Sequence, residues 1–287
     1  MAFNLQTFKT RAVTAVVFVV IMLAGLLWNQ WSFLVLFSVI HFGCWVEYQK
    51  LLGSIDPEYK DISPLHRYGV MLIGFGMMLW MTDAGFYIGT LRLALIGWSL
   101  FWVGLIGFIL SEFLLAKKLN PKIWAHSVLG LLYISLSWGL MMQLFGNING
   151  SILVGPAWIL PVILIASIWI NDTMAYLVGS FIGKTPLSPI SPKKTWEGTI
   201  GGAILAVLIV TLAGVYLFDF SWKAMLLVSV TAAITGTLGD LLESKLKRLA
   251  GVKDSGQLMP GHGGFLDRFD SLLVATTAVW VVLYCFY

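Results

Sequence analysis

The residues with the clearest chemical potential lie near the end of the sequence, in the stretch "PGHGGFLDRFD". Its two aspartates, Asp267 and Asp270, are three residues apart, so both carboxylates face one way if the chain is already helical after Gly264. Asp240, in the preceding apolar run, would bring a third acid to the same place. Carboxylate oxygens are the ligands that hard divalent cations prefer. The three aspartates therefore predict a metal site.

Acidic residues at a helix start also have a structural explanation, because they favour the positive end of the helix dipole. Capping accounts for one aspartate more readily than for a pair that flanks Arg268. We therefore prefer the metal interpretation and keep capping as the alternative.

The glycines of the same stretch suggest an anion site. Gly263 and Gly264 would let backbone amides approach an anion closely, and His262 could donate to a phosphate or orient a ligand. Clusters of Pro and Gly are mostly turns, so this signal is weak alone. It gains force from basic side chains that would supply the charge a polyphosphate needs, namely Lys247, Arg248, Lys253 and Arg268.

The run "TAAITGTLGDLLESKLKR" places Asp240, Ser244 and Lys247 along one face of a predicted helix. A solvated helix end with snorkelling lysines is the alternative. That alternative is weakest for Asp240, because an unpaired carboxylate among apolar residues is costly.

A second polar segment holds "NDTMAY" and "SPKKTWEG". We expect Asn171 and Asp172 to end a membrane span, and Lys193 and Lys194 to lie just before the next one. Lysines beside a helix amino terminus form an anion site, although an ordinary helix start explains the same residues. Four polar residues of the amino-terminal half are expected to be interfacial or paired within the bundle: His41, Glu47, Glu112 and His126.

The elements that must position these residues are membrane helices. The chain of 287 residues is 59% hydrophobic and 11% charged, with a mean hydropathy of +0.87, whereas soluble domains carry about 25% charged residues. Its 13 tryptophans suit the two membrane interfaces. The two cysteines suggest no disulfide framework. The sequence therefore predicts an integral membrane protein and excludes a soluble enzyme.

A membrane helix needs about 20 mostly apolar residues, and nine segments approach this. They are Ala12 to Trp28, Trp31 to Leu52, Tyr68 to Thr82, Leu91 to Leu115, His126 to Phe145, Ile152 to Ile170, Thr199 to Phe218, Trp222 to Leu242 and Ser271 to Tyr287. We expect an all-α, polytopic helical bundle, with five spans in residues 1–150 and four spans forming the catalytic region in residues 151–287.

Charge supports this arrangement, since Lys and Arg collect in cytoplasmic loops. With the amino terminus inside, sixteen of the 18 Lys and Arg residues fall on the inner side, and Arg92 and Lys223 fall outside. Both long polar segments, Asn171 to Gly198 and Glu243 to Asp270, then face the cytoplasm.

The run "SKLKRLAGVKDSGQLMPGHGGFLDRFD", Ser244 to Asp270, closely resembles the signature of bacterial phosphatidate cytidylyltransferases, or CDP-diacylglycerol synthases. "NDTMAY" and "SPKKTWEG" resemble two further blocks of that family. The resemblance is strong from about Ile168 to Asp270, and earlier it is only a matching series of apolar helices. Met259 replaces a more usual Leu, Ile or Phe and leaves the polar set intact.

The resemblance implies a membrane enzyme that condenses CTP with phosphatidic acid to CDP-diacylglycerol and pyrophosphate. It also implies Mg2+ at Asp240, Asp267 and Asp270 with Ser244 and Lys247 alongside, a homodimer in the bacterial cytoplasmic membrane, and no nucleic-acid partner. A potassium ion as a second cation is compatible with the same analogy.

Phosphatidate is already an anion, so its oxygen can attack the α-phosphorus of CTP without a strong general base, and catalysis rests on charge neutralisation. We assign catalytic roles to Ser244, Lys247, His262 and Arg268, and substrate binding to Asn171, Asp172, Lys193, Lys194, Arg248, Lys253, Gly263 and Gly264.

Three alternatives remain. A CTP-dependent kinase of a polyprenol-type lipid would transfer the terminal phosphate instead, and a cytidylyltransferase for another lipid phosphate is closer still. A cation or proton transporter should carry its essential charges near the membrane midplane, whereas here they gather at one face.

Overall fold

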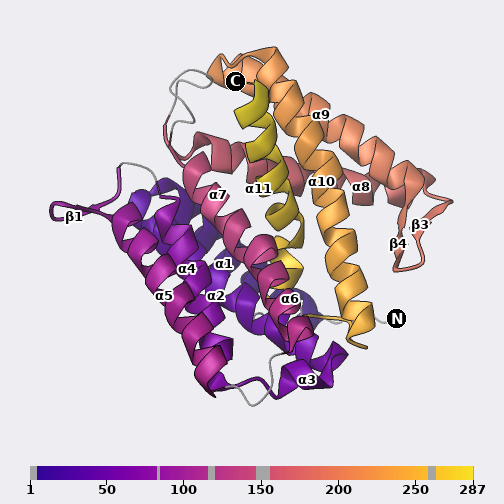
Figure 1. Cartoon of the computed structure of the whole chain (residues 1–287). Coiled ribbons are helices and arrows are strands. Elements are labelled where there is room, and N and C mark those ends of the chain that lie inside the picture. The colour runs from indigo at the N-terminus through magenta and orange to yellow at the C-terminus, as the bar shows by residue number, and fades with distance from the viewer. Residues whose placement is uncertain (1–4, 83–84, 116–119, 147–155, 258–262, 287) are drawn as a thin grey trace.

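The computed structural model describes residues 5–82, 85–115, 120–146, 156–257 and 263–286 and is built almost entirely from helices (Figure 1). This confirms the all-α class. The helices of the amino-terminal half are α1 Leu5–Leu27, α2 Gln30–Ile55, α3 Pro57–Lys60, α4 Pro64–Trp80, α5 Leu93–Leu115, α6 Pro121–Gly130 and α7 Ser137–Leu144, the last two joined by a π-helical turn, η1 Leu131–Leu136. The carboxy-terminal half holds α8 Ile159–Ile182, α9 Trp196–Phe218, α10 Trp222–Leu249 and α11 Leu266–Phe286.

Two short antiparallel hairpins complete the described elements. Strands β1 Tyr87–Ile88 and β2 Leu91–Arg92 precede α5, and strands β3 Pro186–Ser188 and β4 Ser191–Thr195 connect α8 to α9. The second hairpin lies inside a segment predicted as a polar loop, and it fixes where that loop's lysines lie.

Seven helices in the described part of the chain are long and apolar enough to cross a membrane: α2, α5, the continuous α6–η1–α7, α8, α9, α10 and α11. In addition, α1 has a shorter apolar stretch, Val13–Leu27, and α4 has 17 residues. Each predicted span thus overlaps a helix, and the protein is a multi-pass membrane protein. The number nine and the inward amino terminus stay predictions.

One predicted helix end is wrong: the sixth helix does not end at Asn171 and Asp172, because α8 continues to Ile182. Helix α10 runs to Leu249 and α11 begins at Leu266, so both extend beyond the apolar spans, in agreement with the predicted helix faces of Asp240, Ser244 and Lys247 and of Asp267 and Asp270. Polar residues do not end a helix when its other faces stay apolar, and Tyr176 and Phe181 remain largely exposed on α8. The polar residues therefore lie on helix faces rather than in loops.

The surface of the helices agrees with a lipid environment. On α5, Trp98, Val103 and Phe113 are 48%, 71% and 68% exposed, whereas a soluble helix would bury such a stripe. These side chains are stable in an exposed position only where lipid replaces water.

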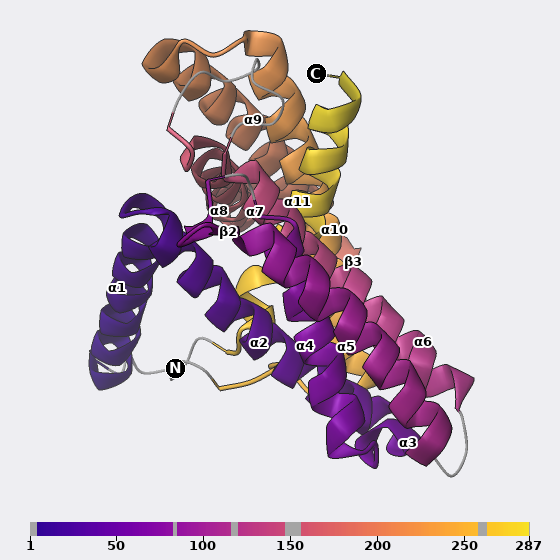
Figure 2. The same ribbon diagram turned by 60° about the vertical axis from the view of Figure 1, so that its left-hand side comes forward.

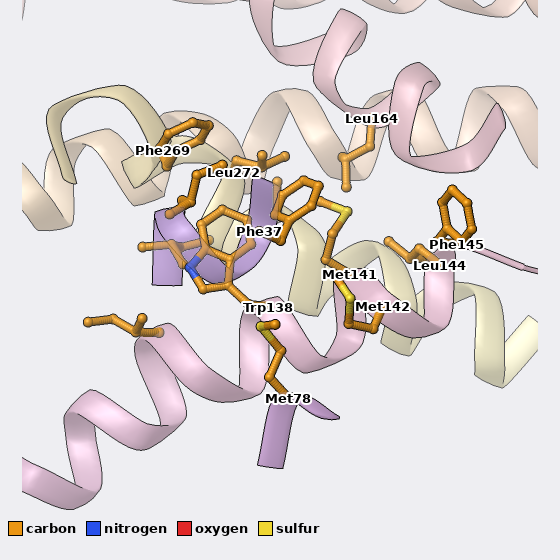
Figure 3. Close-up of a cluster of buried hydrophobic side chains, with 14 of the residues drawn as sticks. Phe37, Met78, Trp138, Met141, Met142, Leu144, Phe145, Leu164, Phe269 and Leu272 are labelled. Atoms are coloured by element: carbon orange, nitrogen blue, oxygen red, sulfur yellow. The ribbon is translucent and has the colours of Figure 1, made fainter. Parts of the chain in front are cut away.

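Aromatic packing joins the two halves of the chain around α7 (Figure 3). The Trp138 ring lies 5.2 Å from Phe37 of α2 and 5.8 Å from Phe269 of α11, measured between ring centroids. All three side chains are almost completely buried. The start of α11, where the predicted aspartates lie, is thereby fixed against the amino-terminal helices (Figure 2).

Helices α8 and α9 pack with their backbones in contact. A Cβ atom on Gly202 would lie 2.4 Å from the backbone nitrogen of Ala175, so only glycine permits this approach. Helix α10 packs on both α9 and α11. The carboxy-terminal helices therefore bring α8, β4 and α10 together at one end.

Candidate active site

A cavity of about 360 Å3 lies between α8, α9, α10 and the β3–β4 hairpin. Five residues singled out by the sequence line it: Asn171 and Asp172 from α8, Lys193 and Lys194 from β4, and Asp240 from α10. The structure therefore brings together two polar sets that are far apart in the sequence.

Local hydrogen bonds hold the two lysines at the amino terminus of α9. The Thr195 hydroxyl accepts from the Gly198 amide at 3.1 Å and caps the helix. Glu197 accepts from the amides of Lys184 and Thr185 and from the Thr185 hydroxyl at 2.8 Å, which ties the hairpin to the helix. The positive end of a helix and two ammonium groups thus face one cavity, an arrangement that favours anions.

The cavity also contains acids. The Lys194 ammonium lies 2.7 Å from Asp240 Oδ2, and both side chains are partly exposed, at 31% and 25%. The charges of Lys194 and Asp240 both act on Asp172. Asn171 is 4% exposed, and its Oδ1 atom has no hydrogen-bond partner in the described part of the protein. An unpaired buried oxygen of this kind is suited to accept from a ligand or to bind a cation.

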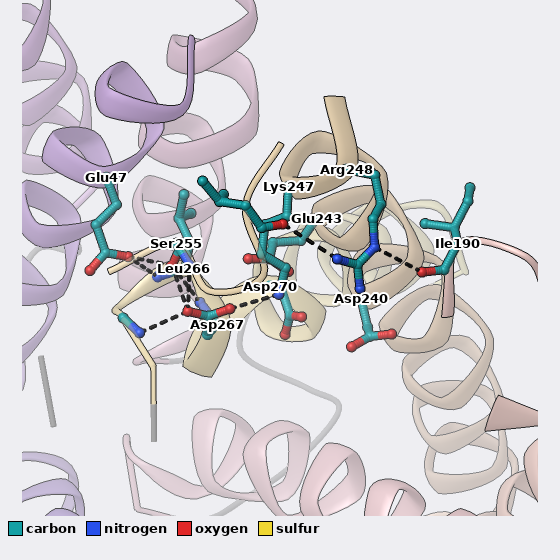
Figure 4. A network of polar contacts seen from close by, with 12 residues as sticks. Glu47, Ile190, Asp240, Glu243, Lys247, Arg248, Ser255, Leu266, Asp267 and Asp270 are labelled. Carbon is teal, nitrogen blue, oxygen red and sulfur yellow. Dashed lines mark hydrogen bonds and ion pairs between the residues drawn. The ribbon is translucent and has the colours of Figure 1, made fainter. Parts of the chain in front are cut away.

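A second polar cluster lies further along α10 (Figure 4). The Lys247 ammonium contacts Glu243 Oε2 at 2.5 Å and Asp267 Oδ1 at 2.6 Å, which links α10 to α11. The Glu243 side chain is fully buried. A buried carboxylate is stable only when it is paired. Lys247 therefore neutralises both Glu243 of α10 and Asp267 at the start of α11.

The other oxygen of Asp267 organises the loop before α11. Asp267 Oδ2 accepts from the Ser255 and Gly264 amides, both at 2.8 Å, and the Ser255 hydroxyl lies at the same distance. With Lys247 on Oδ1, both oxygens of this carboxylate are engaged.

Glu47 reaches this loop from α2, more than 200 residues away in the sequence (Figure 4). Its Oε1 accepts from the Phe265 amide and its Oε2 from the Leu266 amide, each at 2.9 Å. The Ser255 hydroxyl lies 2.7 Å from Oε2, so its one proton is shared between Glu47 and Asp267. A Cβ on Gly264 would approach Glu47 to 2.3 Å, which explains a glycine there.

Asp270 lies between the two clusters and is 7% exposed. Its Oδ1 accepts from the Ser271 amide at 2.6 Å. The negative charges of Asp240, Glu243 and Asp172 all act on it. Helix α10 passes close by, since a Cβ on Gly239 would lie 2.5 Å from the Asp270 carbonyl oxygen.

The fit of these acids to a divalent cation differs from residue to residue. In the described residues, no group of three His, Cys, Asp or Glu side chains is already arranged as a metal site. Asp172, Asp240 and Asp270 nevertheless act on one another electrostatically, with Lys194 as the paired cation. This excess negative charge suits a hard cation, whereas the hydrogen bonds of Asp267 favour a structural role. The predicted set of Asp240, Asp267 and Asp270 stays a prediction.

The other residues predicted for the site that the structure describes do not line the cavity at α8, α9 and α10. Ser244 is half-buried on α10, and Gly263 adopts a left-handed backbone with φ of 80°. Arg248 is exposed and donates to the Ile190 and Val252 carbonyl oxygens at 3.5 and 3.4 Å. Lys253 and Arg268 are also exposed. His262 lies outside the described residues.

Three residues were not predicted as members of the site: Glu47, Glu243 and Ser255. The expectation that Glu47 is interfacial or paired within the bundle agrees with its hydrogen bonds to the Phe265 and Leu266 amides. A glutamate inside an apolar helix was the available signal for Glu47, since such a group needs partners. Its partners could not be identified because they are remote backbone amides.

Comparison with known proteins identifies the family of the chain. The model of the cytidylyltransferase family matches residues 9–286. The chain is 30% identical over 280 residues to the phosphatidate cytidylyltransferase of Staphylococcus saprophyticus, covering 96% of this chain and 98% of that protein.

Shorter, stronger matches concern part of the chain. It is 50% identical over 119 residues to the phosphatidate cytidylyltransferase of Staphylococcus aureus strain COL, which is 40% of this chain and 45% of the relative. It is 51% identical over 107 residues to phosphatidate cytidylyltransferase 4, chloroplastic, of Arabidopsis thaliana, which is 36% of this chain and 27% of that relative. The matched segment thus spans less than half of these two relatives. The family match covers nearly the whole chain, and the chain belongs to the cytidylyltransferase family, a family of nucleotidyltransferases.

Proposed function

We propose that this protein is a phosphatidate cytidylyltransferase, which converts CTP and phosphatidic acid into CDP-diacylglycerol and pyrophosphate. The observation that supports this most strongly is the cavity in which Lys193 and Lys194 meet the acids of α8 and α10. The names of the relatives point to the same reaction.

In this proposal an oxygen of the phosphatidate phosphate forms a bond to the α-phosphorus of CTP, and the bond from that phosphorus to the bridging oxygen breaks. Pyrophosphate leaves with the bonding electrons. Lys193 and Lys194 neutralise the triphosphate, together with the amino terminus of α9. No strong general base is needed, because the attacking phosphate is already ionised.

Lys194 has to exchange partners in this scheme. Its contact with Asp240 is partly exposed to solvent, and such ion pairs contribute about 1 kcal/mol or less. An incoming phosphate can therefore displace the carboxylate. Asn171 would accept from a donor group of the nucleotide with its unpaired Oδ1 atom.

We propose Mg2+ as the cofactor, held by Asp240 and Asp270 with Asp172 beside them. When bound, the ion would neutralise charge on the triphosphate and the departing pyrophosphate. Asp267, Glu47 and Lys247 would hold the loop before α11 in place next to these ligands.

The same proposal places the protein in the bacterial cytoplasmic membrane as a homodimer, with the cavity facing the cytoplasm. The excess of Lys and Arg on one side of the predicted spans supports this orientation. Cytosolic CTP and the headgroup of a membrane lipid can meet only at that interface.

The test is product analysis with purified protein in detergent, supplied with Mg2+, CTP and phosphatidic acid. The proposal predicts equal amounts of pyrophosphate and CDP-lipid, and none after chelation of the divalent ion. Formation of CDP and a lipid phosphate from a lipid alcohol would instead identify a CTP-dependent lipid kinase.

A further inference from the structure

A second cavity, of about 840 Å3, lies between the end of α2, the short α3 and the start of α4. It shares no lining residue with the cavity at α8, α9 and α10. Three cations from three helices line it: Lys50 of α2, Lys60 of α3 and Arg67 of α4. Neither the family match nor the proposed reaction assigns a role to this basic cavity.

The positive charge of the basic cavity is not balanced by ion pairs. None of its three cations forms an ion pair in the residues that the structure describes. Of the three acids of the same connection, Asp56 faces His126 at 3.5 Å and Glu58 accepts from the side chain of Asn120. The third, Asp61, is exposed, and none of the three lines the cavity. The cavity thus keeps a local excess of positive charge, which favours an anionic ligand.

Arg67 gives the clearest indication of a ligand. Its Nη2 donates to the Lys60 carbonyl oxygen at 3.2 Å, which orients the guanidinium within the cavity wall. Its Nε is buried and has no hydrogen-bond partner among the described residues. A buried guanidinium donor left unpaired is costly, and a phosphate oxygen is the type of acceptor that satisfies it.

Besides the polar Gln49 and Ser54, the remaining lining is largely apolar, and part of it belongs to the exposed surface of α2 and α4. Val46, Tyr68 and Met71 line the cavity beside the cations. Val46 is 55% exposed and Tyr68 is 59% exposed. Cations next to lipid-facing apolar side chains match an amphiphile with an anionic headgroup better than a free anion.

The basic cavity lies at the same end of α2 as the loop before α11. Lys50 comes about one turn after Glu47, whose carboxylate binds the Phe265 and Leu266 amides. The predicted charge distribution places this end at the cytoplasmic interface, where lipid phosphates lie.

We propose that Lys50, Lys60 and Arg67 bind the phosphate of an anionic phospholipid at a site separate from the active site. The phosphate accepts hydrogen bonds from Arg67, and the positive charges of the two lysines stabilise it. An acyl chain lies along α2 and α4 past Val46 and Tyr68. This site does not depend on the proposed reaction, because it binds lipid without CTP.

Native mass spectrometry of the purified full chain tests the proposal, with phosphatidylglycerol and phosphatidylcholine as probes and no nucleotide present. The wild type should retain phosphatidylglycerol preferentially. In the variant Lys50→Gln/Lys60→Gln/Arg67→Gln, the retained phosphatidylglycerol should fall about fivefold or more. Loss of a single charged contact of about 1 kcal/mol already lowers affinity by this factor. The single variant Lys50→Gln, which changes only an exposed side chain, should show a smaller loss and guards against misfolding of the triple variant.

Lys122→Gln is the matched control, because Lys122 is an exposed lysine near α3 that does not line the basic cavity. Its lipid retention should equal that of the wild type. Unchanged retention of phosphatidylglycerol in both cavity variants would overturn the proposal. Displacement of the lipid by millimolar inorganic phosphate at constant lipid concentration would also overturn it, because the site would then select a free anion.

Discussion

At the scale of single residues, the site depends on charges whose partners can change. Lys194 and Asp240 are paired but partly exposed, and such a pair costs little to separate. Lys247, in contrast, is held between a fully buried Glu243 and Asp267. We therefore expect Lys194 to bind substrate and Lys247 to hold α10 and α11 together.

Lys194→Gln tests the first of these roles. Loss of one charged phosphate contact of about 1.5–3 kcal/mol should raise the KM for CTP by about 10-fold or more. Lys184→Gln, an exposed lysine of the same connection outside the cavity lining, should leave KM unchanged. Steady-state kinetics with varied CTP measure both, and an unchanged KM in Lys194→Gln would contradict the assignment.

Asp270→Asn separates function from stability. Burial disfavours the charge of this carboxylate, and the neighbouring charges of Asp240, Glu243 and Asp172 repel it as well, so a neutral amide should leave the thermal midpoint equal or higher. Turnover should fall by about 100-fold or more, because loss of a metal ligand removes several kcal/mol of charge stabilisation. Asp254→Asn, at an exposed position, is the control. Near-normal turnover in Asp270→Asn would mean that this carboxylate does not serve the reaction.

At the scale of elements, the loop between α10 and α11 is held by an acid from the other half of the chain. Glu47 accepts from two amides of the loop end, and Ser255 links it to Asp267. The sequence predicts the helices on either side of this loop, and the glutamate within the apolar α2 signals that it needs partners, but nothing in the sequence identifies this loop as the partner. The donors on the loop side are mostly backbone amides, which every residue except proline carries, so the residue types of the loop do not reveal the attachment.

Glu47→Gln should loosen this loop. The new amide group places a donor where the carboxylate accepted from backbone amides, so about 1.5–3 kcal/mol of hydrogen bonding to a charged group is lost. Trypsin should cut faster after the exposed Lys253, and the thermal midpoint should fall by several degrees. Glu58→Gln, on α3 away from the loop, should show neither effect. Equal cleavage rates in the wild type and Glu47→Gln would show that the contact does not restrain the loop.

Helix boundaries were the least predictable part of the elements. The apolar pattern located every long helix but ended the sixth span before Asn171, where α8 in fact continues to Ile182. Mean hydropathy averages over all faces of a helix. Where one face is polar because it lines a cavity, the mean hydropathy falls as it does at a helix end. The correct helical placement of Asp267 and Asp270 came instead from their spacing.

At the scale of the whole molecule, the predicted orientation makes the two ends of α10 face opposite sides of the membrane. Lys223 and Lys245 are both exposed, one near each end of this 28-residue helix. Cys285 is exposed and Cys44 is buried, so Cys285→Ser provides a background with little labelling.

In that background, an impermeant maleimide should label Lys223→Cys in intact cells and Lys245→Cys only after permeabilisation. The physical reason is the excess of Lys and Arg predicted on the inner side. Labelling in the opposite pattern would invert the topology and place the site outside, where CTP is absent.

The sequence was sufficient for the class, the helices and most of the polar residues, because composition and motif spacing are local properties. It did not indicate that Asp267 differs from the acids around the cavity in having both oxygens bound by protein donors, since that depends on which donors from α10 and the loop reach each oxygen. Nor did it indicate the basic cavity, whose cations come from three different helices.

The most direct test follows the label of CTP in a reaction with phosphatidic acid and Mg2+. With the wild type, label from the α-phosphate should enter the lipid and label from the γ-phosphate should leave in pyrophosphate, and both transfers should be lost in Asp240→Asn. Transfer of the γ-label to the lipid, or an Asp240→Asn variant that transfers at the wild-type rate, would contradict the account.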